Sequence, residues 1–227
     1  MTERLKGVLP LAAVIGVLAF FYVEFTLNFT FQWFTDGDLG NGLGLPSSFY
    51  LIAPAGFVSW GFYFAAGAGM EGVKKVAASS VVGSVAALIV MALAPEVADL
   101  PDFWGISLLV GITAFLAVMV VAGGDWYYVP AAFGAYASVI LWWFATGLDN
   151  WAPDGGGIGN SIEALGDPAT AGAGAFGGVL STPYGWVWFN ILITLFLGIL
   201  MGFLSSTITA AITPKPAEEA TEEATEE

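Results

Sequence analysis

The chain of 227 residues contains no cysteine and no histidine, and only five of its residues are lysine or arginine. Without cysteine there is no disulfide, thiol nucleophile or thiolate ligand, and without histidine there is no imidazole base and no imidazole ligand for zinc or heme. Five basic residues against 19 acidic ones give a formal net charge of -14, so no basic surface exists for nucleic acid. We therefore expect no cofactor, no metal site and no nucleic-acid partner.

Charged residues are scarce as a class: Asp, Glu, Lys and Arg make up 11% of the chain, whereas 57% is hydrophobic. Average soluble proteins are about 25% charged, and so few charges cannot cover the surface of a soluble globule. The composition predicts an all-α polytopic membrane protein that contacts the lipid bilayer. The length leaves room for about six transmembrane helices of roughly 20 residues each.

Six apolar runs are long enough to cross a bilayer, at 8–34, 48–69, 76–94, 103–123, 129–147 and 186–209. We expect them to form one transmembrane domain over residues 1–213. Residues 148–185 are rich in Gly, Ala and Pro and predict a long outer loop. Residues 214–227 repeat Glu, Ala and Thr, which predicts a disordered acidic tail in the cytoplasm.

The basic residues set the expected orientation. They precede the first run, separate the second from the third and follow the sixth: Arg4, Lys6, Lys74, Lys75 and Lys215. With six spans all of them fall on one side, which the positive-inside rule makes cytoplasmic. We therefore expect a multi-pass protein of the plasma membrane with both termini in the cytoplasm. The opposite loops carry only acids, which suits a high-salt milieu.

A short pattern occurs in the middle of each half of the chain. Residues 54–57 read PAGF within the second run, and residues 130–133 read PAAF at the start of the fifth. Because each half would hold three spans, the second half would cross the membrane upside down, as in the 3+3 inverted repeats of transporters and channels. Pro54 and Pro130 each predict a helix break or kink. For Pro54 the alternative is a span that simply begins later.

Glu24 is the only ionisable residue inside any of the six runs. A carboxylate at membrane depth costs about 2.5 to 3.5 kcal/mol to insert, so it is expected to face protein or water. Asn28 and Gln32 follow at one-turn intervals and share its face of a helix. The same stretch also alternates polar and apolar residues, which favours an extended segment. If the first span ended near Val23, Glu24 would be interfacial and ordinary.

The sixth run carries a second polar stripe, formed by Asn190, Thr194, Gly198, Gly202 and Ser206. Gly198 and Gly202 make a G-x-x-x-G pattern, which predicts close helix packing. In a six-span topology the first two residues of the stripe lie in the outer half of the membrane, as Glu24 does. One interpretation is a polar lining of an outward-facing vestibule by Glu24, Asn28, Gln32, Asn190 and Thr194. The other is that the stripe serves packing alone.

Intramembrane enzymes are not favoured. A rhomboid-type protease needs histidine beside its serine, and the chain has none. An aspartyl intramembrane protease needs two carboxylates, one of them in Gly-x-Gly-Asp, whereas residues 122–125 read AGGD and lack a partner. Phosphate chemistry would call for arginine or histidine, and the only arginine is Arg4. We therefore expect no enzyme activity.

Two stretches, 54–94 and 104–148, resemble the YcdZ-like bacterial inner-membrane proteins, a family of unknown function. The likeness is carried by AGF after Pro54, by Tyr-Phe-Ala at 63–65, by Gly-Ile-x-Ala-Phe-Leu at 111–116, and by Pro130 with Phe133. The resemblance implies a small multi-span membrane protein and no known activity. This chain departs from the family in its long outer loop and acidic tail.

Two functions remain compatible with the sequence. The first is a channel-like or secondary transporter for a small polar solute, and the alternative is a non-transporting membrane scaffold or accessory subunit. A transporter is expected to set its polar stripes along an internal aqueous cavity, whereas a scaffold is expected to pack them tightly. In both cases the small residues on the helix faces predict a homo-oligomer.

Overall fold

The computed structural model of the chain describes residues 3–30, 46, 49–97, 100–101, 104–145 and 184–213. These ranges contain no strand, so the part of the chain that is described is all helical. The elements in chain order are α1 (Glu3–Thr30), α3 (Ala53–Ala65), α4 (Gly69–Leu93), η1 (Ala94–Val97), α5 (Trp104–Met119), η2 (Val120–Gly123), α6 (Val129–Ala145) and α8 (Tyr184–Ile212).

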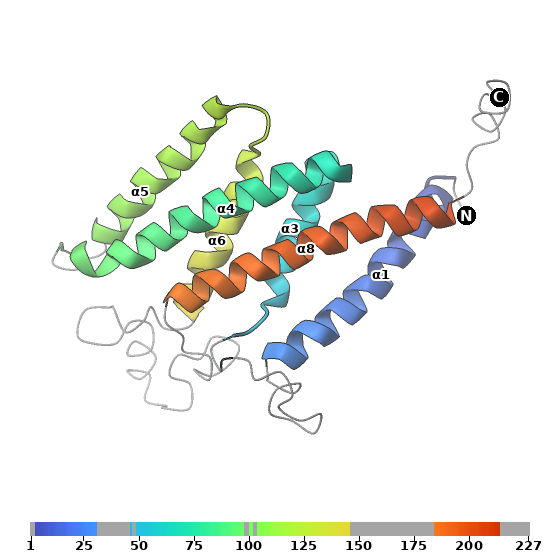
Figure 1. Cartoon of the computed structure of the whole chain (residues 1–227), viewed down its shortest axis with the longest axis horizontal. Helices are drawn as coiled ribbons and strands as arrows, with labels where there is room; N and C mark the ends of the chain where they lie inside the picture. The colour runs from blue at the N-terminus through green and yellow to red at the C-terminus, as the bar shows by residue number, and fades with distance from the viewer. Residues whose placement is uncertain are drawn as a thin grey trace.

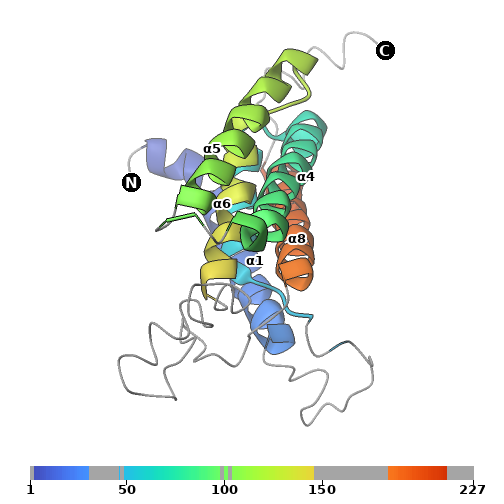
Figure 2. The ribbon, with the colours of Figure 1, turned by 90° about the vertical axis from the view of Figure 1, so that its left-hand side faces the viewer.

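Successive α-helices run in opposite directions, so the chain passes back and forth between two ends of the bundle (Figure 1). The start of α1, the α3–α4 turn and the end of α8 lie at one end, and the starts of α3 and α8 lie at the other. Helices α4 and α8 lie side by side, flanked by α5 and α1, with α3 and α6 behind them (Figure 2). This layering puts α3 against α8 and α6 against α4.

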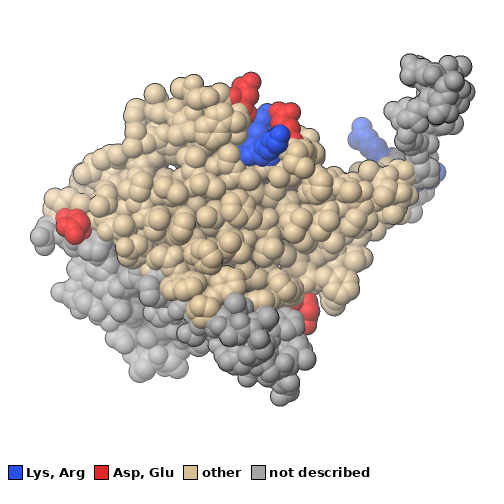
Figure 3. Space-filling model, viewed as in Figure 1, with Lys and Arg blue, Asp and Glu red and all other residues tan. Residues whose placement is uncertain are grey.

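Within the described ranges, four helices are long and apolar enough to cross a membrane, over Arg4–Phe29, Gly69–Leu93, Trp104–Gly123 and Tyr184–Ile212. A shorter apolar helix covers Val129–Phe144, and α3 has only 13 residues. Lys, Arg, Asp and Glu side chains lie at the margins of a broad uncharged surface over α4 and α8 (Figure 3). These features are those of a multi-pass membrane protein, in which the uncharged surface meets lipid.

The second helix is shorter than the sequence predicts, and both prolines lie in the first turn of a helix. Helix α3 begins at Ala53 instead of near Ser48, so Pro54 lies in its first turn. Pro130 is likewise the second residue of α6. Proline is tolerated there because its missing N–H has no helical acceptor in the first turn, and it disfavours helix in the residue before it. Neither proline therefore kinks a helix. Both open one, which for Pro54 agrees with the alternative of a span that begins later.

The third helix begins earlier than expected, at Gly69 instead of Val76. A tight turn with positive φ at Gly67 (99°), Ala68 (56°) and Gly69 (60°) separates it from α3, and glycine adopts such angles without steric cost. The two lysines expected between the second and third spans therefore lie within a helix. Lys74 and Lys75 belong to the first turns of α4, where the Lys75 Nζ lies 2.6 Å from a carboxylate oxygen of Glu71.

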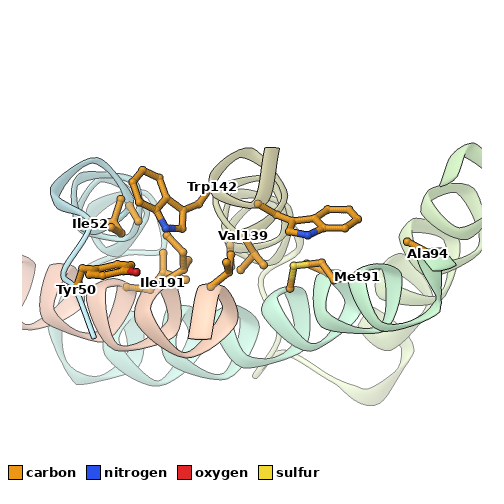
Figure 4. Packing of buried hydrophobic residues seen from close by; sticks show 13 residues of the cluster. Tyr50, Ile52, Met91, Ala94, Val139, Trp142 and Ile191 are labelled. Atoms are coloured by element: carbon orange, nitrogen blue, oxygen red, sulfur yellow. The ribbon is translucent and has the colours of Figure 1, made fainter. Parts of the chain in front are cut away.

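The main buried cluster joins α4, α6 and α8 with the residues that lead into α3 (Figure 4). Trp142, Val139 and Trp143 come from α6, and they meet Met91 of α4 and Ile191 of α8. Trp143, Val139 and Ile191 are at most 1% exposed. Apolar side chains therefore pack the interior of the bundle closely around the last turns of α6.

Three predictions lie outside the described residues. The outer loop at 148–185 is described only for its last two residues, and the acidic tail at 214–227 and Gln32 are not described. The preferred helical interpretation of the Glu24 segment is confirmed as far as Thr30, where α1 ends.

Candidate functional site

The residues that lead into α3 are buried without being helical. Tyr50, Leu51 and Ile52 are 4%, 3% and 6% exposed. Backbone groups outside a helix need hydrogen-bond partners when they lie away from water. The N–H of Ile52 donates to the hydroxyl of Thr194 on α8 at 3.0 Å. That hydroxyl in turn donates to the carbonyl of Asn190 at 2.7 Å, so Thr194 connects the start of α3 to α8.

One turn further along α8, Gly198 lies directly on α3. A Cβ at this position would overlap the carbonyl of Gly56 and the Ser59 hydroxyl. The Ser59 hydroxyl also donates to the carbonyl of Leu195 at 2.6 Å. Only glycine allows this approach of two backbones. The predicted packing glycine therefore sits where α3 and α8 are closest.

The start of α6 makes a contact of the same kind with α4. The N–H of Tyr128 donates to the hydroxyl of Ser79 at 2.8 Å. One turn further along α4, a Cβ at Gly83 would overlap the carbonyl of Ala132. Ser79 is fully buried. Helix α4 thus meets the start of α6 through a hydroxyl and a glycine spaced as on α8.

The two contacts match position by position. In each, the hydroxyl accepts from the residue two before the proline, Ile52 or Tyr128. In each, the glycine packs against the carbonyl of the residue two positions after the proline, which is Gly56 or Ala132. Ser79 and Gly83 are not among the residues predicted from the sequence. The signal that could have found them is the shared spacing of a hydroxyl residue and a glycine four positions apart on α4 and α8.

A tyrosine hydroxyl connects each helix start to the long helix before it. Tyr22 of α1 donates to the carbonyl of Ala53 at 3.3 Å. Tyr127, in the residues before α6, donates to the carbonyl of Ala117 of α5 at 2.6 Å. Burial raises the pKa of Tyr127, so its hydroxyl stays protonated as a donor across the neutral range. Both helix starts are therefore held from two sides.

The far end of the α3–α8 contact has a further polar group. The hydroxyls of Tyr63 and Ser206 share a hydrogen bond of 2.6 Å, and the Tyr63 hydroxyl accepts the N–H of Gly69 at 2.9 Å. The Tyr63 ring lies against Gly202, where a Cβ would come within 2.6 Å of it. The polar stripe of α8 is thus in contact with α3 from Thr194 to Ser206.

The structure does not bring the predicted vestibule lining together. Asn190 and Thr194 are fully buried between α8 and its neighbours, whereas Glu24 is exposed on α1. The amide nitrogen of Asn28 donates to the Glu24 carbonyl at 2.7 Å and to its carboxylate at 3.2 Å. Exposed Glu24 and half-buried Asn28 do not line one cavity with the fully buried residues of α8, so Glu24 and Asn28 form a separate surface group on α1.

Two hollows on the described part of the chain are apolar grooves. One of about 590 Å³ lies between α3 and α6, and one of about 330 Å³ lies between α4 and α5. Neither is lined by a charged residue. Across the described helices, no three acidic side chains gather as metal ligands would. The polar chemistry of the bundle is concentrated at the helix starts and along the α3–α8 contact.

Residues 15–210 match the model of a family described as a protein of unknown function, DUF1097. The chain belongs to this family. The DUF1097 match includes both helix starts and both hydroxyl–glycine pairs, and it covers the two stretches, 54–94 and 104–148, on which the predicted resemblance rests. The description of the family gives neither the YcdZ-like name nor an activity. No curated protein and no solved structure matches the chain.

Proposed function

We propose that this DUF1097 protein is a channel-like or secondary transporter for a small polar solute, built as a 3+3 inverted repeat. The halves would be α1–α3–α4 and α5–α6–α8. The observation that carries the proposal is the matched pair of contacts at the helix starts. In each, the proline-opened helix of one half receives a hydroxyl and a glycine from the last helix of the other half.

The arrangement of the helices supports the same division. The most extensive pairings are α4 with α6 and α3 with α8, which correspond under exchange of the halves. The pairings of α4 with α5 and of α8 with α1 also correspond. When Thr194 is set on Ser79, every buried residue of α8 except Asn190 falls on a buried residue of α4. Corresponding helices run in opposite directions (Figure 1).

The position of the helix starts suits transport. Helix α3 starts at one end of the bundle and α6 at the other (Figure 1). Transporters of this design keep short, interrupted helices at the repeat interface, where freed backbone groups and helix N-termini meet the solute. A path beside α3 would offer backbone groups, hydroxyls and the Asn190 amide, all uncharged at neutral pH. We therefore propose a neutral polar solute. Thr194 would close the path at the start of α3 and Ser79 at the start of α6, one after the other in the transport cycle.

The proposed orientation follows from the basic residues. Arg4 and Lys6 belong to the start of α1, and Lys74 and Lys75 to the start of α4, at the same end of the bundle (Figure 1). The positive-inside rule assigns this end to the cytoplasm. We propose six crossings in the plasma membrane, with α3 and α6 completed by the segments that lead into them. A cysteine at Met70, which is 55% exposed, should then resist a membrane-impermeant reagent added outside, whereas a cysteine at Pro101 should react.

One observation favours the alternative, a scaffold or accessory subunit. The polar stripe of α8 packs directly on α3, with Gly198 against a carbonyl and Gly202 against a ring. A scaffold would keep this contact permanently, whereas a transporter would separate it at least partly during each cycle. The two functions therefore differ in whether weakening the contact changes solute flux.

The test is solute-driven swelling of liposomes that contain the purified full-length protein. A panel of urea, glycerol, acetamide and small neutral amino acids covers the proposed class. We expect at least one solute to enter faster than into protein-free liposomes. Thr194→Val and Ser79→Ala each remove the acceptor of a buried N–H, and we expect each to change that rate at least threefold.

The matched control is Ser205→Ala on the same face of α8. Its hydroxyl donates only within its own helix, to the carbonyl of Met201 at 2.7 Å, so its flux should equal that of the unchanged chain. Swelling no faster than in empty liposomes across the whole panel would favour the scaffold. A rate equally sensitive to all three substitutions would remove the helix starts from the mechanism.

A further inference from the structure

Helices α3 and α6 present matching exposed rows on the face away from α4 and α8. The rows have the same spacing from the two prolines, and they consist of Phe57, Gly61 and Ala65 on α3 and of Phe133, Ala137 and Leu141 on α6. Each row begins with a phenylalanine, and a small residue follows one turn later. The row on α3 ends with Ala65, whereas the row on α6 ends with Leu141. Leu141 is 70% exposed.

Between the rows lies the apolar groove of about 590 Å³. Val58 and Phe62 form its α3 wall, and Gly134, Ala137 and Leu141 form part of its α6 side. The groove is deep at Gly134 because this residue has no side chain, and the ring of Phe62 from α3 lies against Gly134. A groove bordered by projecting aromatic and aliphatic side chains has both the ridge and the hollow that a self-complementary contact requires.

The residues that complete the α3 crossing, 50–52, are buried, so the helix is the part exposed on this face. The lengths of the two helices therefore argue against lipid as the sole cover of this face. Helix α3 has 13 residues and α6 has 17, or about 20 and 26 Å at 1.5 Å per residue. A bilayer core is about 30 Å thick. The helices at the two edges of the bundle are longer, with 28 residues in α1 and a 20-residue span that begins at Trp104. Short helices exposed to lipid thin the bilayer or associate.

We propose that the α3–α6 face binds the same face of a second copy of this chain, around a twofold axis along the membrane normal. Both copies insert with their basic ends on one side, so the two grooves face each other at the same depth. Phe133 and Leu141 of one copy enter the groove of the other, and Gly61 and Ala137 let the backbones approach closely. The short helices then lie inside the dimer, while α1 and α5 meet lipid.

Cysteine cross-linking in native membranes tests this face directly, because the chain contains no cysteine of its own. Ala137→Cys should give a covalent dimer on mild oxidation. Leu108→Cys is the matched control, since Leu108 is 54% exposed but lies on α5. We expect it to remain monomeric. Dimers from Leu108→Cys but not from Ala137→Cys, or equal yields at both positions, would overturn the proposal.

A bulky substitution gives a second measurement that does not depend on oxidation. Ala137→Trp fills the groove from an exposed position, so the fold should be kept, and thermal stability of the protomer checks this. In nanodiscs we expect the unchanged chain and Leu108→Trp to have the mass of two copies, and Ala137→Trp that of one. A single-copy mass for the unchanged chain would overturn the proposal. Solute flux enters neither experiment, so the dimer is tested apart from transport.

Discussion

The contact of α3 with α8 and the contact of α6 with α4 begin alike and continue differently. At both starts a hydroxyl accepts a backbone N–H and a glycine covers a carbonyl. Beyond that point the α3–α8 contact remains polar, with Ser59 bonded to Leu195 and Tyr63 bonded to Ser206. The positions of α6 and α4 that correspond to these hydroxyl residues are apolar: Ala135, Val139 and Met91 are all buried in the main cluster.

This difference shows that one backbone arrangement can be held by two kinds of interaction. Apolar packing loses many small contacts at once when helices part, and no other partner replaces them. Hydroxyl groups can exchange one hydrogen-bond partner for another or for water. Within the proposed transport function, the α6–α4 contact is therefore the fixed one and the α3–α8 contact the one that separates. Four predictions test this comparison, and they follow in order of expected effect.

Trp143→Ala should have the largest effect, because it removes the bulkiest fully buried side chain of the apolar contact. Trp143 is 1% exposed and belongs to the cluster of Val139 and Met91. Truncation of a buried aromatic side chain costs about 3–5 kcal/mol. We expect the thermal midpoint of monodisperse protein in detergent to fall sharply. A loss as small as that from truncating exposed Phe115 would show that α6–α4 is not the fixed contact.

Gly198→Ala and Gly83→Ala should come next, with losses of similar size. At both positions the new Cβ meets a backbone carbonyl, which cannot move aside as a side chain can. Overpacking of this kind costs about 1–3 kcal/mol. Gly111→Ala on α5 is the control, because a Cβ there meets nothing within 4 Å, and it should be neutral or stabilising. Very different losses at Gly198 and Gly83 would contradict the equivalence of the two helix starts.

Tyr63→Phe tests the polar part that only the α3–α8 contact has. The change removes the partner of Ser206 and the acceptor of the Gly69 N–H, at a cost of about 1 kcal/mol. Tyr136→Phe is the matched control in the other half, since its hydroxyl shares one bond of 3.1 Å with Thr113. Thermal midpoints should fall further for Tyr63→Phe, and solute flux should change only for it. Equal effects on both measurements would remove the distinction between the contacts.

Glu24→Gln should have the smallest effect, because Glu24 lies on the exposed side of α1 and outside both contacts. We expect unchanged flux and a change in stability within about 0.5 kcal/mol. Glu24→Leu removes the cost of inserting a carboxylate, so it should be neutral or stabilising. Flux and its pH dependence should be measured for both variants in liposomes. Altered flux with Gln would return Glu24 to the polar lining that is one interpretation of the sequence.

Much of the architecture is predictable because hydropathy and proline geometry are local properties. The shortage of charge and the apolar runs indicate a helical membrane protein before any contact is known. The G-x-x-x-G pair at Gly198 and Gly202 also predicts a close helix contact from spacing alone. The helix bounds are less accurate. The start of α3 shifts to Ala53 and that of α4 to Gly69, because Pro54 and the positive-φ turn are stronger determinants there than hydropathy.

The partners of the polar residues depend on tertiary structure. The sequence groups Glu24 with Thr194 by their depth in the membrane, but rotation of the helices leaves one exposed and buries the other. Ser79 is one of three serines on α4. It gains a role only because α6 packs there and brings the N–H of Tyr128 within 2.8 Å. Hydropathy along the chain is therefore enough to indicate which segments are helical and apolar. Which hydroxyls and glycines meet depends on how each helix is turned toward its neighbours, and helix packing alone decides this.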